Sequence, residues 1–107
     1  MVNKVNGLLG ITAKSGNIIS GTEVVLEAIS KKKVYLVIVC TDSSEKTIKN
    51  IKYFCDKEYD EMIVYGNIFD NSKAIGKRNR AIIGICDINL ADAIKKEIHG
   101  GVEFGKN

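Results

Sequence analysis

The sequence predicts an α/β fold, specifically a three-layer α/β/α sandwich, from three observations. Segments with helical spacing of apolar residues alternate along the chain with short, apolar, β-branched segments. The connections between these segments are short, as in a compact domain. The 107 residues are 45% hydrophobic and 27% charged and include no proline, so no linker divides the chain. We therefore expect residues 1–107 to form a single domain.

The first two helices and the first two strands follow from apolar spacing and glycines. Residues 3–13 carry apolar side chains at helical intervals, and Gly16 suits the left-handed position that ends a helix. Ile18-Ile19 fits a very short strand. Ser20-Gly21-Thr22-Glu23 is typical of a helix start, and the apolar stripe behind it ends near Lys31. Residues 34–40 are apolar on both sides of the pleat, which predicts a central strand.

The middle of the chain predicts a helix, a strand and a brief helix. Asp42 or Ser43 can cap a helix whose apolar residues repeat at helical spacing as far as Cys55. Residues 62–65 form the next predicted strand. Asp70 or Asn71 can cap the brief helix that follows.

The last third predicts one more strand and one more helix. The apolar segment at residues 81–86 is the strand. Asp87 or Asn89 can cap a helix that runs through Ile98, and we expect Gly100-Gly101 to end it.

The net charge of +3 is unevenly distributed along the chain. Residues 1–33 carry five lysines and two acids, residues 34–72 four lysines and seven acids, and residues 73–107 seven basic and four acidic residues. If the two basic thirds meet in space, one face of the protein is positive and attracts a polyanion. A solvated, lysine-rich surface is the alternative, and charge alone favours neither.

No motif indicates a metal site, a disulfide framework or a membrane segment. Cys40, Cys55 and Cys86 are odd in number and widely spaced, and the only histidine is His99. The longest apolar run, at residues 34–40, is far shorter than the roughly 20 residues that cross a bilayer. Because the N-terminus also lacks a secretory signal, we expect a cytoplasmic protein with no cofactor, no metal and no membrane partner.

No pattern in the sequence predicts an enzyme active site. A nucleophile with a base, a pair of carboxylates or a metal cluster is not convincingly placed, and the glycine spacing fits no nucleotide-binding loop. Asp42 and Asp87 each follow an apolar strand, where α/β folds bind ligands, but both are also natural helix caps. We favour capping and predict that the protein is not an enzyme.

A glycine at the start of the second helix indicates a binding surface. Gly21 leaves the first backbone N–H groups of that helix free at its positive dipole end, and it lets a phosphate backbone approach closely. Further basic residues stand beside Gly16 and Gly76. Glycine also caps helices in ordinary proteins, so a purely structural role is the alternative.

Four segments follow one another along the chain: AKSGN at residues 13–17, GTEVVLEAI at 21–29, VYLVIVCTD at 34–42 and AIGK at 74–77. In this order and spacing they resemble the kink-turn-binding ribosomal protein family of archaeal and eukaryotic large subunits. The likeness extends from Val5 to Ile98 and is greatest to the small bacterial stand-alone paralogues.

The resemblance implies a four-stranded mixed sheet between helices, and RNA binding without catalysis. It places a sharply bent RNA on the start of the second helix, the loop before that helix and the loop after the last strand. Ile88 would cover an extruded base, and the basic residues would supply the salt-dependent part of the affinity. The residues expected to bind RNA are Lys14, Gly21, Thr22, Glu23, Lys32, Lys33, Lys77, Arg78, Ile88 and Asn89.

Several positions differ from the best-known RNA binders of that family. Those proteins have Asn-Glu after the Gly-Thr pair and a basic residue one turn later, whereas this chain has Glu23-Val24 and then Glu27. Asn71-Ser72 replaces a Leu-Gly pair. Two hypotheses follow: a monomeric, non-catalytic binder of structured RNA, kink-turn-like or ribosomal, or a protein-interaction or ribosome-assembly module that has lost tight RNA recognition.

Overall fold

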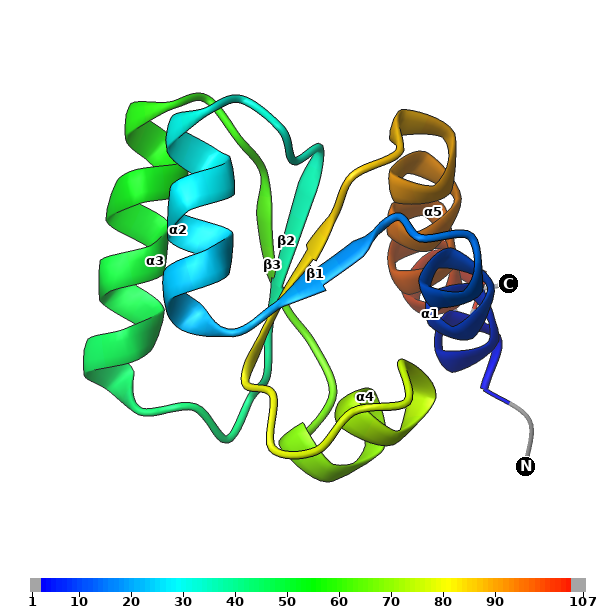
Figure 1. Cartoon of the computed structure of the whole chain (residues 1–107). Coiled ribbons are helices and arrows are strands. Elements are labelled where there is room, and N and C mark those ends of the chain that lie inside the picture. Colours follow the sequence, from blue (N-terminus) through cyan, green and yellow to red (C-terminus); the bar gives the residue numbers. More distant parts are fainter. Residues whose placement is uncertain (1–2, 105–107) are drawn as a thin grey trace.

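The structure is a sheet with helices on both faces (Figure 1). The computed structural model describes residues 3–104, in which helices and strands alternate. The helices are α1 (Lys4–Lys14), α2 (Thr22–Ser30), α3 (Glu45–Lys57), α4 (Ile68–Ala74) and α5 (Ile88–Phe104). The strands are β1 (Ile18–Ser20), β2 (Leu36–Val39), β3 (Met62–Val64) and β4 (Ile82–Ile85). The predicted α/β/α sandwich is confirmed.

The sheet is mixed and has the strand order β1-β4-β2-β3. β4 runs antiparallel to both β1 and β2, and β2 runs parallel to β3. The central strands β2 and β4 are buried along their whole length. The apolar run at residues 34–40 predicts this position, because a central strand needs apolar side chains on both sides of the pleat.

Each face of the sheet has its own apolar core. α1 and α5 cover one face and bury Leu9 and Ile94, while α2 and α3 cover the other and bury Ile29 and Ile51 (Figure 1). Alternate residues of β2 enter the two cores in turn, as the period of a strand requires. The two cores hold all four strands between the helix layers.

The cap of α3 differs from the predicted one. Ser44 caps the helix, and its Oγ accepts the N–H of Thr47 at 3.1 Å. Asp42 instead accepts the N–H of Ile68 through Oδ1 at 3.0 Å, which ties the loop before α3 to the start of α4. The capping prediction for Asp42 and Ser43 is therefore wrong, because a neighbouring element supplies the donor for Asp42.

The cap of α4 lies before the predicted position. Asn67 caps the helix, and its Oδ1 accepts the N–H of Asp70 at 2.7 Å. Asp70 and Asn71 lie inside α4, and only 1% of Asn71 is exposed. The prediction of either residue as the cap is wrong, because the protein encloses the Asn71 amide as part of its interior.

The last helix begins as predicted and ends later. Asp87, one of the two candidate caps, accepts the N–H of Leu90 through Oδ2 at 2.8 Å. α5 then continues to Phe104. The expectation that Gly100-Gly101 ends the helix is wrong, because glycine lowers helix stability by only about 1 kcal/mol per residue and does not forbid the conformation.

Candidate nucleic-acid interface

α2 begins at the end of the sheet where β4 also begins. The N–H of Gly21 donates to the carbonyl of Ile82, the first residue of β4, at 2.9 Å. Gly21 has φ +100° and ψ 146°, a conformation that glycine adopts readily and other residues do not. It supplies no side-chain cap, so the first N–H groups of α2 have no acceptor from their cap residue. These groups form the positive end of the helix dipole.

The loop before β4 lies against this helix start. We call residues 77–80 the pre-β4 loop. A Cβ atom on Gly21 would lie 3.4 Å from Nη1 of Arg80, so the guanidinium reaches the glycine. Ser72 of α4, only 2% exposed, accepts the N–H of Arg80 through Oγ at 2.8 Å and donates to its carbonyl at 3.3 Å. Ser72 thereby holds both backbone groups of Arg80 beside the start of α2.

Asn71 fixes the turn that leads into α4. Its Nδ2 donates to the carbonyl of Tyr65 at 2.8 Å and to Sγ of Cys40 at 3.3 Å. Asn71 and Ser72 are the two residues that replace the Leu-Gly pair. Both are buried and hydrogen-bonded, so they order the turn and the pre-β4 loop rather than loosen them.

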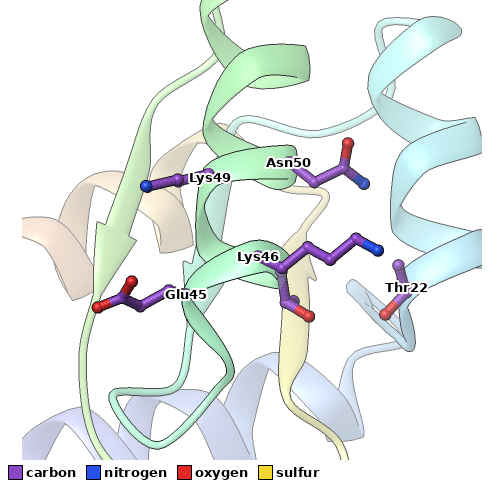
Figure 2. Close-up of a pocket in the computed structure, with 6 residues that line it drawn as sticks. Thr22, Glu45, Lys46, Lys49 and Asn50 are labelled. Carbon is purple, nitrogen blue, oxygen red and sulfur yellow. The ribbon is translucent and has the colours of Figure 1, made fainter.

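A groove of about 750 Å³ lies between the first turns of α2 and α3. We call it the α2–α3 groove. Figure 2 shows Lys46 and Asn50 projecting from α3 toward α2, while Glu45 and Lys49 project from the opposite side of the helix. The groove continues the surface that begins at Gly21, and it offers an ammonium and an amide to a ligand. Its lining residues are Thr22, Glu45, Lys46, Thr47, Lys49 and Asn50.

The cations at this end of the molecule form no ion pair with the side chains described by the structure, those of residues 3–100. They are Lys46, Lys73, Lys77, Arg78 and Arg80. Ion pairs elsewhere include Lys32 with Glu58 at 3.5 Å and Lys95 with Glu61 at 2.9 Å. A polyanion can therefore bind the unpaired cations without first breaking salt bridges, and their field attracts it.

The structure brings half of the predicted RNA-binding residues to this surface and leaves the others at the opposite end of the sheet. Those at the surface are Gly21, Thr22, Glu23, Lys77 and Arg78. Those at the other end are Lys14, Lys32, Lys33, Ile88 and Asn89. The expectation that the start of α2 adjoins the loop after β4 is therefore wrong, and the loop before β4 takes that place.

The antiparallel pairing of β1 with β4 is the physical reason. Ser20 pairs with Ile83 near the start of β4, whereas Ile18 pairs with Ile85 at its end. Gly21 follows Ser20 and so lies near the start of β4. At about 3.4 Å per residue, the loop after β4 is roughly 13 Å farther along the strand.

Lys32 has a structural role at that far end. Its ammonium donates to the carbonyl of Glu58, lies 3.5 Å from the Glu58 carboxylate and is 5.9 Å from the centre of the Tyr59 ring. These contacts join the end of α2 to the end of α3. The charge of Lys32 is thus already matched within the protein.

The sequence analysis missed Arg80 and Lys46. Arg80 directly precedes an apolar strand, and Gly21 directly follows another. Antiparallel pairing of these two strands places the residues together, but neither segment alone indicates the direction of pairing. Lys46 lies on the exposed side of an amphipathic helix, where a binding lysine has the same sequence pattern as a solvated one.

Other kinds of site are not formed by the described part of the chain. Among the side chains of residues 3–100, no group of three or more His, Cys, Asp or Glu is placed to hold a metal ion. No helix in this range has the length and apolar character needed to cross a membrane. Cys40 and Cys55 are buried, Cys86 is half-buried, and all three are free thiols.

Comparison with known proteins identifies the family. Residues 3–97 match the model of the Ribosomal protein L7Ae/L30e/S12e/Gadd45 family. The chain belongs to this family. The match extends from α1 into α5, so it includes Gly21, the pre-β4 loop and the α2–α3 groove. The resemblance noted in the sequence is confirmed.

Two curated relatives are small bacterial members of this L7Ae-type family. One, from Enterococcus faecium, is named RNA-binding protein YlxQ and is 31% identical over 100 residues, covering 91% of this chain and 93% of that protein. The other, also named RNA-binding protein YlxQ, comes from Bacillus subtilis (strain 168). It is 25% identical over 93 residues, covering 81% of this chain and 87% of that protein.

Solved structures of similar proteins have the same fold. A protein of unknown function from Bacillus halodurans matches with a TM-score of 0.87 and 30% identity, over 90% of this chain and 97% of that one. The Giardia lamblia 15.5kD RNA binding protein matches with a TM-score of 0.75 and 17% identity, over 96% of this chain and 91% of that one. At 17% identity, the second match shows the fold alone.

Proposed function

We propose that this protein binds structured RNA without catalysing a reaction. The surface is the start of α2, the pre-β4 loop and the α2–α3 groove. The observation that carries the proposal is the Gly21-capped end of α2, with the Arg80 guanidinium beside it and unpaired cations around it. Free N–H, guanidinium and ammonium groups are the donors that bind phosphate. The names of the two YlxQ relatives support RNA as the polyanion.

A sharply bent RNA of kink-turn type is the target that we propose, either free or within the ribosome. The helix start is flanked by the pre-β4 loop on one side and by the α2–α3 groove on the other. Such a surface offers hydrogen-bond donors in several directions. It therefore suits a bent RNA, whose two arms converge, better than it suits a straight duplex. In this proposal the chain acts as one monomeric domain in the cytoplasm.

Binding to two RNAs of equal length tests the proposal. A kink-turn RNA and a straight duplex are titrated in a gel-shift assay between 50 and 200 mM salt, with wild-type protein and with Lys77→Gln/Arg78→Gln. We expect tighter binding of the kink-turn RNA. Because Lys77→Gln/Arg78→Gln loses two phosphate contacts, its plot of log affinity against log salt should fall less steeply, with a slope smaller in magnitude by about 1.5. The salt-induced loss of affinity over this range then becomes about 8-fold smaller.

A matched variant controls for net charge. Lys57→Gln/Lys96→Gln removes the same charge from exposed side chains on α3 and α5, outside the proposed surface. Its salt slope should equal that of the wild type. If both double variants lower the slope equally, the assigned surface is incorrect. If the wild type binds both RNAs equally, the kink-turn target is incorrect although RNA binding stands.

A protein-interaction or ribosome-assembly role is the second candidate function. Val24, 51% exposed, and Glu27 present an apolar and an acidic side chain on the outer face of α2. The Glu27 carboxylate lies 3.5 Å from the Lys31 ammonium, but both groups are solvated, so the pair masks little charge. Copurification with and without nuclease separates the two functions, because protein contacts survive the treatment and RNA-bridged contacts do not.

A further inference from the structure

The strand β3 forms one edge of the sheet and has free backbone groups. It is the last strand in the order β1-β4-β2-β3, so it pairs only with β2. The carbonyl of Glu61 and the N–H of Tyr65 both bond to β2, at 2.9 and 3.0 Å. Because backbone groups alternate in direction along a strand, the N–H and carbonyl groups of Met62 and Val64 point away from β2. These groups have no hydrogen-bond partner in the described part of the chain.

The residues of β3 do not block the addition of a further strand. Natural sheets often protect their edges with lysine, proline or a bulge. β3 consists of Met62, Ile63 and Val64, so it contains neither a charge nor a proline. Met62 and Ile63 pack against the two apolar cores, whereas Val64 is 41% exposed. Val64 therefore offers an apolar contact to a short extended segment that pairs with this edge.

The start of β3 carries a surplus of acidic side chains. The Lys95 ammonium is shared by two of them, because it lies 2.9 Å from the Glu61 carboxylate and 3.9 Å from that of Asp92. Asp60 forms no ion pair with any described side chain. The pKa of the Lys95 ammonium is raised, first by the hydrogen bond that it donates to Glu61 and further by the charges of Glu61 and Asp92. The potential at this end of β3 therefore favours a cation.

This charge favours one of three possible occupants of the edge. The acids repel RNA phosphates, and a second copy of the chain would bring the same acidic segment, since residues 56–61 contain four acids and one lysine. An extended segment rich in lysine and arginine supplies both the missing backbone partners and the opposite charge. Tyr59 lies three residues before β3 and is 94% exposed, so its ring can stack on a guanidinium of such a segment.

We propose that β3 pairs with a basic, extended segment of another protein, which adds a fifth strand to the sheet. The backbone of this segment bonds to Met62 and Val64, and its lysine or arginine side chains bind Asp60 and Glu61. The inference does not depend on RNA binding. β1 and β3 are the two opposite edges of the sheet, and Gly21 follows β1, so both partners can bind at once.

Amide hydrogen exchange with a synthetic peptide tests the pairing. The probe is a capped peptide of alternating valine and threonine with two arginines at each end, and glutamates replace the arginines in its acidic counterpart. The basic peptide should slow exchange at Met62 and Val64 and leave Ile63, which already pairs with β2, unchanged. The acidic peptide should protect neither residue. If the basic peptide gives no protection, or both peptides give the same protection, the proposal is wrong.

A proline substitution removes one outward donor without breaking the sheet. The N–H of Met62 is not used by β2, so Met62→Pro keeps the bonds within the sheet. It should weaken binding of the basic peptide by about 2- to 13-fold, which corresponds to one lost hydrogen bond. Ser20→Pro is the matched control, because the N–H of Ser20 points away from the sheet at the other edge, on β1. An equal loss of affinity in the two variants would contradict the assignment of the edge.

A charge variant tests the acidic end and does not alter the backbone. Asp60→Asn/Glu61→Gln should weaken binding of the basic peptide by about 2- to 30-fold, as expected from the loss of two partly exposed ion pairs. Glu23→Gln/Glu27→Gln makes the same charge change on α2 and should bind the peptide like the wild type. Equal effects of the two double variants would show that the acids near β3 are not the binding groups.

The exchange experiment also identifies the other two occupants. If the kink-turn RNA protects Met62 and Val64, the edge binds nucleic acid and the proposal fails. If their protection rises with protein concentration in the absence of peptide, the occupant is a second copy of the chain, and the proposal fails as well.

Discussion

The substitution Gly66→Ala isolates a collision inside the turn before α4. Gly66 has φ +70°, and a Cβ atom on it would lie 2.3 Å from Oδ1 of Asn71 and 2.8 Å from Cγ and Nδ2 of the same side chain. Asn71 is buried and bonded to the Tyr65 carbonyl, so it cannot move aside without losing that bond. Gly76 is the matched control, since its φ is +71° and nothing lies within 4 Å of its Cβ position.

The expected losses of stability differ by the cost of that collision. A non-glycine residue in the left-handed region costs roughly 1–2 kcal/mol, which is all that Gly76→Ala should lose. Displacing the Asn71 amide leaves the half-buried Tyr65 carbonyl unpaired and adds about 1–3 kcal/mol, so Gly66→Ala should lose about 2–5 kcal/mol. At about 4 °C per kcal/mol for a domain of this size, the melting temperature should fall by roughly 8–20 °C.

Urea denaturation followed by circular dichroism measures both variants. A double-mutant cycle with Asn71→Ala then tests the mechanism, because removing the amide removes the atoms that the new methyl group meets. The double variant Gly66→Ala/Asn71→Ala should be more stable than the sum of the single losses predicts, by about 1–3 kcal/mol. Equal losses for Gly66→Ala and Gly76→Ala, or strict additivity in the cycle, would refute this reasoning.

Three further predictions concern stability and titration. Gly84→Ala should lose about 1–3 kcal/mol in the same assay, because its Cβ would lie 2.9 Å from Cγ1 of Ile19; a loss within error would contradict it. Burial, with nearby acids, raises the pKa of the Cys55 thiol to about 11, so iodoacetamide at pH 8.5 should label half-buried Cys86 first and Cys55 only in urea. Burial also raises the pKa of the Asp60 carboxyl, because the folded protein disfavours its charged form. The contribution of Asp60 to the free energy of unfolding is therefore fully present below the unfolded pKa near 3.8 and is lost as the pH rises through the folded pKa. Asp60→Asn should therefore gain stability relative to the wild type as the pH rises above about 3.8, as urea midpoints will show.

The elements of the fold follow from local patterns in the sequence. β2 is apolar on both sides of the pleat, and α2 has one apolar stripe. Each of these local patterns predicts its element without any knowledge of tertiary contacts. The caps are less certain because Asp42, Ser43 and Ser44 stand together and any of them can cap a helix. Asp42 bonds to Ile68, 26 residues away, and that contact decides which residue remains as the cap.

The candidate interface depends on strand direction, which the sequence does not encode locally. Both loops that flank β4 are polar and contain residues suited to RNA, so composition cannot choose between them. The antiparallel pairing of Ile18 with Ile85 and of Ser20 with Ile83 determines which loop adjoins the start of α2. It brings Arg80 to Gly21 and moves Ile88 away, which is why prediction from the order of motifs placed the wrong loop at the start of α2.

The buried residues of α4 connect this geometry to binding. Ser72 holds the backbone of Arg80 on both sides, while Asn71 fixes the turn that positions the same helix. A guanidinium on an ordered backbone loses less conformational entropy on binding than one on a mobile loop. In the proposed interface, these two polar side chains, which stand where the resemblance implies a Leu-Gly pair, would preorganise the cations. Since the same loop also carries Lys77 and Arg78, the hydrogen bonds of Ser72 position these two cations near the start of α2 as well.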